Sequence, residues 1–388
     1  MKFVIATDSY KGSLTSIEAG ETMADAIREE LPAAEIVVVP MADGGEGTVA
    51  SIVHATGGTY MPVRVCGPLG EPVDAGWGRS GAEPATAVLE TASAAGLPMV
   101  PEDRRNPLHT TSRGLGELML DALDSGMRTF IVGLGGSATN DGGMGMLTAL
   151  GARFTDAQGK ALAGYGRELG RVAAVDYAGL DPRLRECRLI AASDVTNPLC
   201  GPDGCAHVFG PQKGADPATV AALDEAMRGY AALVEAHLGH TYAAQPGSGA
   251  AGGLGFGLRT LGAELVPGAQ LVGEAVRLAE HVRGADWVLT GEGMSDAQTL
   301  QGKLPAHVAE VARDAGAGCL LLSGAIGADA DALLARFDGC FAAVARPAEL
   351  ATCMREAQVN VDRTARSIAR LIKRASQPTS QSATPEQP

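Results

Sequence analysis

One stretch constrains the fold of this chain more than any other: residues 128–151, RTFIVGLGGSATNDGGMGMLTALG. It begins with an apolar, β-branched run at 129–134, which has the length of a buried strand. The glycine-rich segment 133–143 follows, and 144–150 has the composition of a helix. Glycines permit tight turns, and the N–H groups at the start of a helix attract anions. This order of strand, loop and helix therefore predicts a phosphate-binding turn.

The residues of this loop leave two other interpretations open. The first is an ordinary glycine-rich turn followed by a capped helix. The second is a dinucleotide fingerprint, because GLGGSA, from Gly133 to Ala138, has the required spacing. Asp156 then follows at roughly the offset of about 20 residues expected for a ribose-binding carboxylate. The loop alone does not distinguish a nucleoside triphosphate from a dinucleotide.

Composition and charge narrow the classes of protein and partner. The 388 residues suffice for two or three domains, and a hydrophobic content of 46% indicates a globular protein. The formal net charge of −14 repels nucleic acid and anionic membranes, so neither is an expected partner. An acidic protein that binds phosphates must rely on backbone N–H groups, a divalent metal and a few lysines.

The cysteines and the N-terminal segment predict a cytoplasmic protein. Seven cysteines are an odd number, and no two have CxxC spacing, which is typical of thiols in a reducing cytosol. The first residues, MKFVIATDSYKG, have the pattern of a strand rather than of a signal peptide. No window approaches the roughly 18 uncharged apolar residues of a membrane span.

The alternation of strands and helices predicts an α/β fold with two α/β domains. Strand, helix and strand patterns at the N-terminus are typical of a parallel sheet, and the same pattern returns near Ala285. We therefore expect a discontinuous Rossmann-like domain with a second, mixed α/β domain inserted and the active site in the interdomain cleft. The expected boundaries are 1–58 plus 285–375 for the first domain, 59–284 for the inserted domain and 376–388 for a disordered tail.

Six loops carry more polar and charged side chains than folding alone requires. They are 8–13, 42–48, 133–143, 193–201, 210–215 and 291–303. Each loop taken singly is equally well explained as an ion pair, a turn or a helix cap. Nearly all of them follow a predicted strand or precede a predicted helix, and this placement favours a shared cleft.

Several catalytic motifs are absent from the sequence. There is no GxxxxGK[ST] loop, no HRD loop and no GxSxG elbow, and the few histidines lie outside the glycine loops. Acidic residues, lysines and anion-binding backbone remain. This set suits phosphoryl transfer, in which positioning and charge neutralisation supply most of the catalysis.

Seven motifs together resemble, in order and spacing, the type 1 glycerate kinase family. They are DSYKGSLT, PMADGGEGT, GLGGSATNDGGMGML, SDVTNPLCG, VFGPQKGA, GSGAAGGLG and TGEGMSDAQTLQGK, and the resemblance runs from Lys2 to about Arg374. It implies two α/β domains and ATP-dependent phosphorylation of D-glycerate to 2-phosphoglycerate. The sequence departs from the family pattern GEGRxDSQT in one loop, where Met294 replaces the arginine and Ala297 the serine.

The resemblance implies roles for particular residues, with ATP and Mg²⁺ as cofactors and D-glycerate as substrate. The expected catalytic residues are Asp194, Lys11, Lys213, Asp296 and Lys303. The expected cofactor-binding residues are Gly135, Gly136, Ser137, Thr139, Asn140, Asp141, Gly252 and Gly253. The expected substrate-binding residues are Asp8, Ser9, Asp43, Gly44, Gly45, Asn197 and Glu292. Asp43 and Asp194 are the candidate metal ligands, and Asp194 is also favoured as the base.

Two alternatives from other classes remain at this point. An NAD-dependent hydroxy-acid dehydrogenase would use the GLGGSA loop and Asp156, but it leaves the other loops unexplained. A non-catalytic sensor of glycerate or nucleotide would be consistent with Met294 in the last loop. The sequence leaves a homodimer open and does not separate 2-phosphoglycerate from 3-phosphoglycerate as the product.

Overall fold

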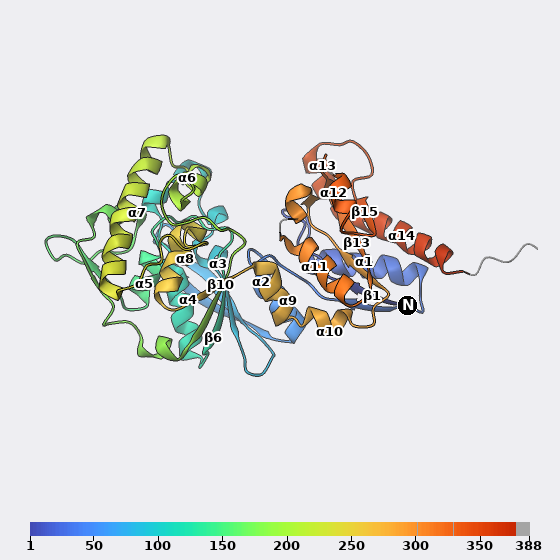
Figure 1. Cartoon of the computed structure of the whole chain (residues 1–388), viewed down its shortest axis with the longest axis horizontal. Helices are drawn as coiled ribbons and strands as arrows, with labels where there is room; N and C mark the ends of the chain where they lie inside the picture. Colours follow the sequence, from blue (N-terminus) through green and yellow to red (C-terminus); the bar gives the residue numbers. More distant parts are fainter. Residues whose placement is uncertain (301, 329, 378–388) are drawn as a thin grey trace, which may run out of the picture. The chain divides into compact units, whose positions relative to one another are not determined.

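The chain divides into two compact units (Figure 1). The computed structural model describes residues 1–300, 302–328 and 330–377. The first unit contains Met1–Pro40, Leu278–Gln301 and the chain from Pro305 onwards, and the second contains Met41–Arg277 and Gly302–Leu304. The disordered tail expected at 376–388 lies outside the described residues, apart from Ser376 and Gln377.

The first unit is built on a parallel sheet in the order β15-β13-β11-β1-β2. Its strands are β1 (Lys2–Ile5), β2 (Glu35–Val38), β11 (Trp287–Thr290), β13 (Gly318–Ser323) and β15 (Gly339–Ala342), with a small pair β12 (Met294–Ser295) and β14 (Ala325–Ile326). Its helices are α1 (Ser16–Glu30), α10 (Leu278–Val282), α11 (Leu304–Asp314), α12 (Ala330–Leu334), α13 (Leu350–Arg355) and α14 (Ala357–Ala375).

Helices α1 and α14 pack side by side on one face of this sheet. Phe3 and Ile5 of β1 point into their shared core, while Val4, on the opposite face of the strand, is also fully buried. Burial on both faces explains why the strands are continuous apolar runs. Helix α1 begins with a capping box, because Thr15 and Glu18 each accept a hydrogen bond from the other's backbone N–H.

The strand order of the first unit places a topological switch point between the parallel strands β1 and β11. From β1 the chain first adds β2 on one side and later adds β11, β13 and β15 on the other. Open parallel sheets bind ligands beyond the carboxyl ends of the strands at such a point. The loops 6–13 and 291–296 leave the sheet there, and both were singled out by their polar residues.

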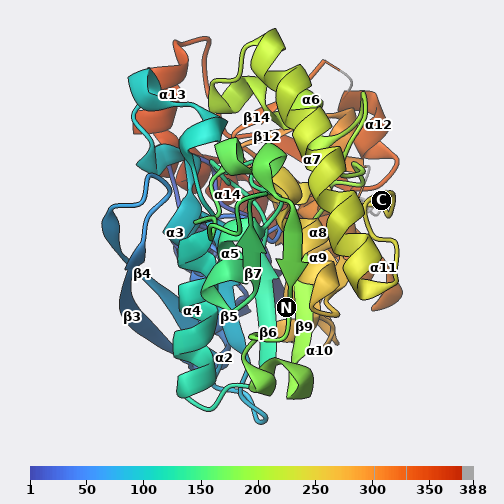
Figure 2. The same ribbon diagram turned by 90° about the vertical axis from the view of Figure 1, so that its left-hand side faces the viewer.

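The second unit contains a mixed sheet in the order β10-β9-β6-β5-β4-β3, and Figure 2 shows part of this order. Its strands are β3 (Thr59–Cys66), β4 (Pro72–Arg79), β5 (Ala87–Glu90), β6 (Thr129–Gly133), β9 (Arg188–Ala192) and β10 (Glu264–Val266), with a small pair β7 (Arg153–Thr155) and β8 (Ala174–Asp176). Its helices are α2 (Thr48–Thr56), α3 (Thr91–Ala95), α4 (Arg113–Asp124), α5 (Met144–Ala149), α6 (Cys205–Phe209), α7 (Pro217–Leu238), α8 (Ala250–Thr260) and α9 (Gly268–Ala275).

Four parallel strands of the second unit end in register. Glu90 pairs with Gly133, Gly133 with Ala192, and Ala192 with Val266, so the last residues of β5, β6, β9 and β10 form one row. The loops that follow these strands therefore start from a single edge of the sheet. This register explains how polar segments far apart in the sequence come together.

The expected fold class is confirmed, with two α/β units built on one parallel and one mixed sheet. The boundaries differ from those expected at 58 and 285: the first unit ends at Pro40 and resumes at Leu278. Helix α2 packs against β3, β4 and β5, which is why it groups with the second unit. The alternation of strands and helices at the N-terminus continues across this boundary, so the sequence pattern does not reveal it.

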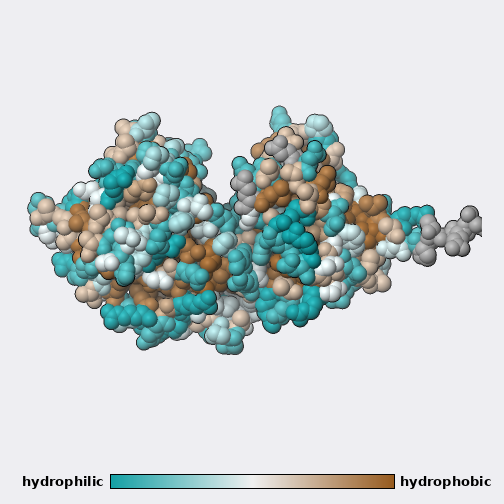
Figure 3. All heavy atoms as spheres, in the orientation of Figure 1, coloured by the Kyte–Doolittle hydropathy of each residue, from teal (hydrophilic) through white to brown (hydrophobic). Residues whose placement is uncertain are grey.

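The described residues contain no helix with the length and hydropathy needed to cross a bilayer. On the face drawn in Figure 3, hydrophilic side chains surround smaller apolar areas.

Candidate active site

Three of the polar loops meet at the carboxyl edge of the second unit's sheet. A Cβ atom placed on Gly135 would lie 2.5 Å from the Cα atom of Gly45. A Cβ on Gly44 would lie 2.6 Å from the Cβ atom of Ala192, and Gly44 also has a φ of +83°. The loop 42–48 therefore crosses the ends of β6 and β9 at a distance that only glycine permits.

The glycine-rich loop 247–257 also joins this group. The Gly249 N–H donates to the Asn197 carbonyl at 2.9 Å, which connects the loop 247–257 to the loop 193–201. The Gly142 N–H donates to the Gly252 carbonyl at 3.0 Å, which connects the same loop to 133–143. Residues 251–253 have left-handed backbone conformations, so this segment forms a kink within α8.

Lys213 lies inside this group rather than on an open surface. Its side chain comes from the short turn 211–213, and the residue is 2% exposed. The Nζ atom donates to Ser137 Oγ at 3.0 Å and to the Thr139 carbonyl at 2.7 Å. Burial lowers the pKa of Lys213 to about 8. Lys213 therefore supports the glycine loop from inside, and its expected catalytic role remains a prediction.

Asp141 also turns inward. Its carboxylate accepts hydrogen bonds from the Ser112 N–H and hydroxyl, both at 2.7 Å, and from the Gly143 and Gly145 N–H groups at 3.1 and 3.2 Å. Burial raises the pKa of Asp141 above its usual value. The N–H groups at the start of α5 are therefore engaged by the protein's own carboxylate. The expected anion site at that helix start is already filled by this side chain.

The turn at residues 135–137, which precedes α5, still has backbone N–H groups that make no hydrogen bond to the described residues. The N–H groups of Gly135, Gly136 and Ser137 make no hydrogen bond to any residue that the structure describes, and Gly136 is exposed. The side-chain atoms Thr139 Oγ1 and Asn140 Nδ2 are buried and likewise have no partner among the described residues. These groups are the part of the loop with hydrogen-bonding capacity left for a ligand.

The carboxylates of Asp43 and Asp194 belong to the same edge. Asp43 Oδ1 accepts the Gly45 N–H at 2.9 Å, and Asp194 Oδ1 accepts the Gly268 N–H at 2.8 Å, at the start of α9. A Cβ atom on Gly268 would lie 1.9 Å from the Asp43 carbonyl, so both aspartates adjoin this one glycine. Asp194 is exposed and Asp43 is half-buried. Both aspartates thus lie where the sequence placed a base and a metal ligand, and those roles remain predictions.

Glu90 is a residue of this edge that the sequence reasoning missed. It is the last residue of β5, beside Gly133, and its carboxylate accepts the Val49 N–H at 2.7 Å near the start of α2. Burial, reinforced by the charge of Glu46, raises the pKa of Glu90 to about 7. The sequence feature that could have identified Glu90 is a glutamate at the end of an apolar strand, AVLE.

Two of the residues singled out from the sequence have local structural roles. Asn197 donates from Nδ2 to the Asp203 carbonyl at 2.8 Å, which closes its own loop. Asp156 accepts N–H groups from Gln158 and Lys160 and pairs with Arg171 at 3.0 Å. The carboxylate oxygens of Asp156 are thus engaged by nearby residues of the chain. The dehydrogenase alternative would instead need this carboxylate to bind the ribose of a dinucleotide.

A second set of expected site residues belongs to the first unit. The Asp8 N–H donates to the Gly291 carbonyl at 2.9 Å, so the loops after β1 and β11 are in direct contact. Asp8 is buried and Lys11 is exposed. A Cβ atom on Gly293 would lie 3.5 Å from the backbone nitrogen of Lys11, so the backbone of the loop 8–13 runs beside Gly293.

The loop 291–303 is held by its own polar residues. Glu292 Oε1 accepts the Ser295 and Thr299 hydroxyls at 3.0 and 2.7 Å. Asp296 Oδ1 accepts the Gln298 N–H at 2.8 Å. Met294, at the position of the family arginine, pairs with Ala325 in a short strand and is 56% exposed. Lys303 is half-buried and falls in the second unit.

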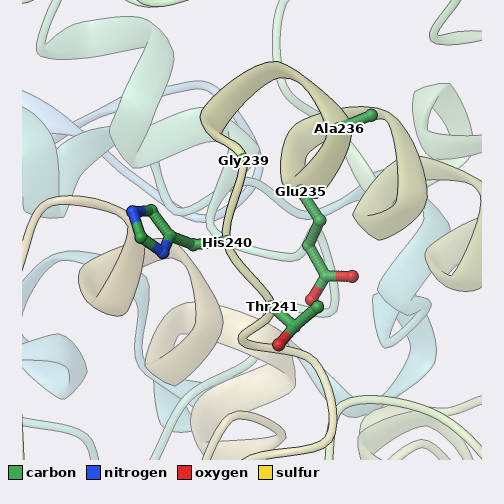
Figure 4. Close-up of a pocket in the computed structure, with 5 residues that line it drawn as sticks. All are labelled: Glu235, Ala236, Gly239, His240 and Thr241. Carbon is green, nitrogen blue, oxygen red and sulfur yellow. The ribbon is translucent and has the colours of Figure 1, made fainter.

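The hollow in Figure 4 lies apart from these loops, at the end of α7. It has a volume of about 410 Å³ and is lined by Glu235, Ala236, Gly239, His240 and Thr241. Glu235 Oε1 accepts the N–H groups of Tyr242 and Ala243 at 2.6 and 2.7 Å, and the His240 ring points away from it. Glu235 therefore fixes the chain after α7, and we assign no functional role to this hollow.

The described residues contain no group of three or more His, Cys, Asp or Glu side chains arranged to hold a metal ion. Magnesium is commonly bound by one or two carboxylates together with water and substrate phosphates. Asp43 and Asp194 fit this pattern, because both adjoin Gly268 at the edge that carries the unengaged N–H donors.

Comparisons with known proteins place this geometry in a family. The model of the glycerate kinase family matches residues 3–373. The chain is 44% identical to glycerate 2-kinase of Escherichia coli K12, over 95% of this chain and 97% of that protein. It is 46% identical to glycerate kinase of Bacillus subtilis 168, over 97% and 98%.

A solved structure agrees with these relatives. The crystal structure of a candidate glycerate kinase 2 from Salmonella typhimurium LT2 superposes with a TM-score of 0.87 at 43% identity, covering 97% of this chain and 99% of that chain. Family, relatives and structure agree over almost the entire length, and they speak against the dehydrogenase alternative. The chain belongs to the glycerate kinase family.

Proposed function

We propose that this protein transfers the γ-phosphoryl group of ATP to the 2-hydroxyl of D-glycerate and releases ADP and 2-phosphoglycerate. The observation that carries the proposal is the family match over residues 3–373. A relative covered over 97% of its length is named as a glycerate 2-kinase. The polar loops at the carboxyl edge of the second unit's sheet supply the groups that such a reaction needs.

The turn at Gly135–Ser137 is the proposed anion site. Its three N–H groups are not used by the described residues, and Lys213 supports the turn from inside through Ser137 and Thr139. Fixed backbone donors stabilise negative charge on a phosphoryl group without reorganising during the reaction. Because a phosphoryl transition state carries its charge on the equatorial oxygens, such donors lower the barrier.

Asp194 is the proposed base. Its carboxylate is exposed at the end of β9, and the Gly268 N–H fixes one of its oxygens. In the proposed step the 2-hydroxyl proton of D-glycerate passes to this carboxylate. The hydroxyl oxygen forms a bond to the γ-phosphorus, and the bond from that phosphorus to the bridging oxygen of ADP breaks.

Asp43 is the proposed ligand of a magnesium ion, with Asp194 as the second candidate. Bound there with ATP, the ion would neutralise charge on the phosphate oxygens. Lys11, Asp296, Lys303 and Glu292 remain predicted site residues of the loops in which they lie. Their predicted roles are charge neutralisation and substrate binding.

The experiment is an assay of ADP release by the purified protein with ATP, Mg²⁺ and D-glycerate. The proposal predicts ADP release that depends on D-glycerate, with no change in NADH absorbance when NAD⁺ replaces ATP. Binding of D-glycerate or ATP without turnover would favour the sensor alternative. NADH formation would favour the dehydrogenase. Either of these two results would overturn the proposed function.

A further inference from the structure

A second hollow lies in the first unit, beyond the end of β15. It has a volume of about 460 Å³ and is bounded by the segment after β15 and by helices α13 and α14, which Figure 1 draws in orange and red. Its lining residues are Val344, Ala345, Arg346, Ala348, Cys353, Glu356, Val359, Asn360 and Arg363. Pockets of this size hold small molecules rather than single ions.

Asn360 is the polar side chain buried deepest in this hollow. The residue is only 5% exposed. Its Oδ1 atom accepts a hydrogen bond from Arg363 Nη1 at 3.2 Å, which fixes the amide orientation because the guanidinium can only donate. The Nδ2 group then has no hydrogen-bond partner among the described residues, while Asn360 lines the cavity. This amide donor is therefore available to an acceptor that enters the hollow.

The charges around the hollow favour a negative ligand. Two guanidinium groups, those of Arg346 and Arg363, face one carboxylate, that of Glu356. Arg346 pairs with Glu356 at 3.2 Å, which leaves the charge of Arg363 without an acidic partner in the described lining. This cationic balance occurs in a chain whose net charge is −14. Guanidinium groups and an amide N–H are typical donors to carboxylate and phosphate oxygens.

We propose that this hollow is a binding site for a small molecule that carries an oxyanion, a phosphate or a carboxylate group. Asn360 Nδ2 and the Arg363 guanidinium donate to the anionic oxygens. Val344 and Val359 form the apolar wall against which the rest of the ligand lies. The hollow belongs to the first unit, where α13 borders the polar loop 8–13, because a Cβ atom on Gly12 would lie 2.6 Å from the Met354 Cε atom. The proposal concerns the binding of an anion, and its test does not depend on the phosphorylation of glycerate.

Cys353 provides a local readout, because it lines the hollow and is a free, half-buried thiol. The experiment measures alkylation of the cysteines by iodoacetamide, mapped by mass spectrometry, with and without inorganic phosphate. Potassium chloride is added to equalise ionic strength. Bound phosphate should slow alkylation of Cys353 by about threefold or more, as expected when about two thirds or more of the sites are occupied. Cys66 and Cys187, also half-buried and far from the hollow in sequence, should be unaffected.

Acetate replaces phosphate in a second arm, so that protection by one anion or the other identifies the group that the site prefers. N360D keeps an acceptor for Arg363 but replaces the amide donor with a charge that repels anions. R363Q removes the cation. Both variants should lose the protection of Cys353, whereas the matched control R355Q, on α13 outside the lining, should retain it. Absence of protection by both anions in the unaltered protein, or protection that survives N360D and R363Q, would overturn the proposal.

Discussion

The ammonium group of Lys213 shows how one residue supports a loop from inside. It is buried against the carbonyl of Thr139 and the hydroxyl of Ser137, and no carboxylate of the described residues is hydrogen-bonded to it. Burial without an ion pair disfavours the charged form, which is why the pKa falls to about 8. The sequence predicted that Lys213 belongs to the site, but not its orientation. Whether a lysine faces a ligand or the interior depends on packing that spacing does not encode.

The pH dependence of stability tests the buried ammonium. The unfolded chain holds the Lys213 proton up to about pH 10.5, whereas the folded chain releases it near pH 8. Between these values the unfolded state binds more protons, so this group makes the free energy of unfolding rise with pH. The free energy of unfolding of the unaltered protein, relative to that of K213M, should rise by up to about 3 kcal/mol between pH 8 and pH 10.5.

Urea unfolding at a series of pH values from 7 to 11 measures this difference. K160M removes an exposed lysine of the same unit and should give a curve parallel to that of the unaltered protein. A K213M curve that is also parallel would show that Lys213 is not buried as described.

Substitution of Asp194 tests its role without removing its structural hydrogen bond. In D194N the amide oxygen still accepts the Gly268 N–H at the start of α9, but the basic carboxylate is lost. Loss of a general base lowers kcat by about 100-fold or more. The matched control is D216N, because Asp216 caps α7 through the same kind of hydrogen bond. Steady-state ADP release should stay near normal in D216N; near-normal kcat in D194N would remove Asp194 from the mechanism.

At the scale of secondary-structure elements, local signals predicted much of the fold. The capping box at Thr15 and the cap at Asp216, followed by Pro217, are formed by residues adjacent in sequence, so such helix starts can be read from local sequence alone. Side chains that cap an element distant in sequence were missed. Glu90 ends β5 yet accepts an N–H of α2, and the carboxylate of Asp141 is enclosed by Ser112 as well as by its own helix. Tertiary packing alone brings these partners together.

The contact between Glu90 and α2 predicts a second dependence on pH. The folded chain holds the Glu90 proton up to about pH 7, compared with 4.5 for the ordinary group. The folded state thus binds more protons between these values, and this group lowers the free energy of unfolding as pH rises. E90Q keeps an oxygen for the Val49 N–H and does not titrate. The stability of the unaltered protein relative to E90Q should fall from pH 4.5 to 7 in urea unfolding; a constant or rising difference would contradict the assignment.

At the scale of the whole molecule, register organises the candidate site. The row Glu90, Gly133, Ala192 and Val266 brings four strand ends to one edge, and the glycines of 42–48 let that loop lie across it. Parallel sheets gather such loops wherever strands alternate with helices, so this part of the site was predictable from the motif order. The boundary after Pro40 was not, since α2 continues the alternation while packing on the other sheet.

The measurement that tests the account most directly is a proton-coupled phosphorus NMR spectrum of the reaction with ATP, Mg²⁺ and D-glycerate. A phosphate on carbon 2 couples to one proton and gives a doublet, whereas a phosphate on carbon 3 couples to two and gives a triplet. We predict that the signals of ADP and of a phosphomonoester doublet grow together as the ATP signals decline. A triplet would contradict the proposed site of transfer, and the absence of any phosphomonoester would contradict the proposed kinase activity itself.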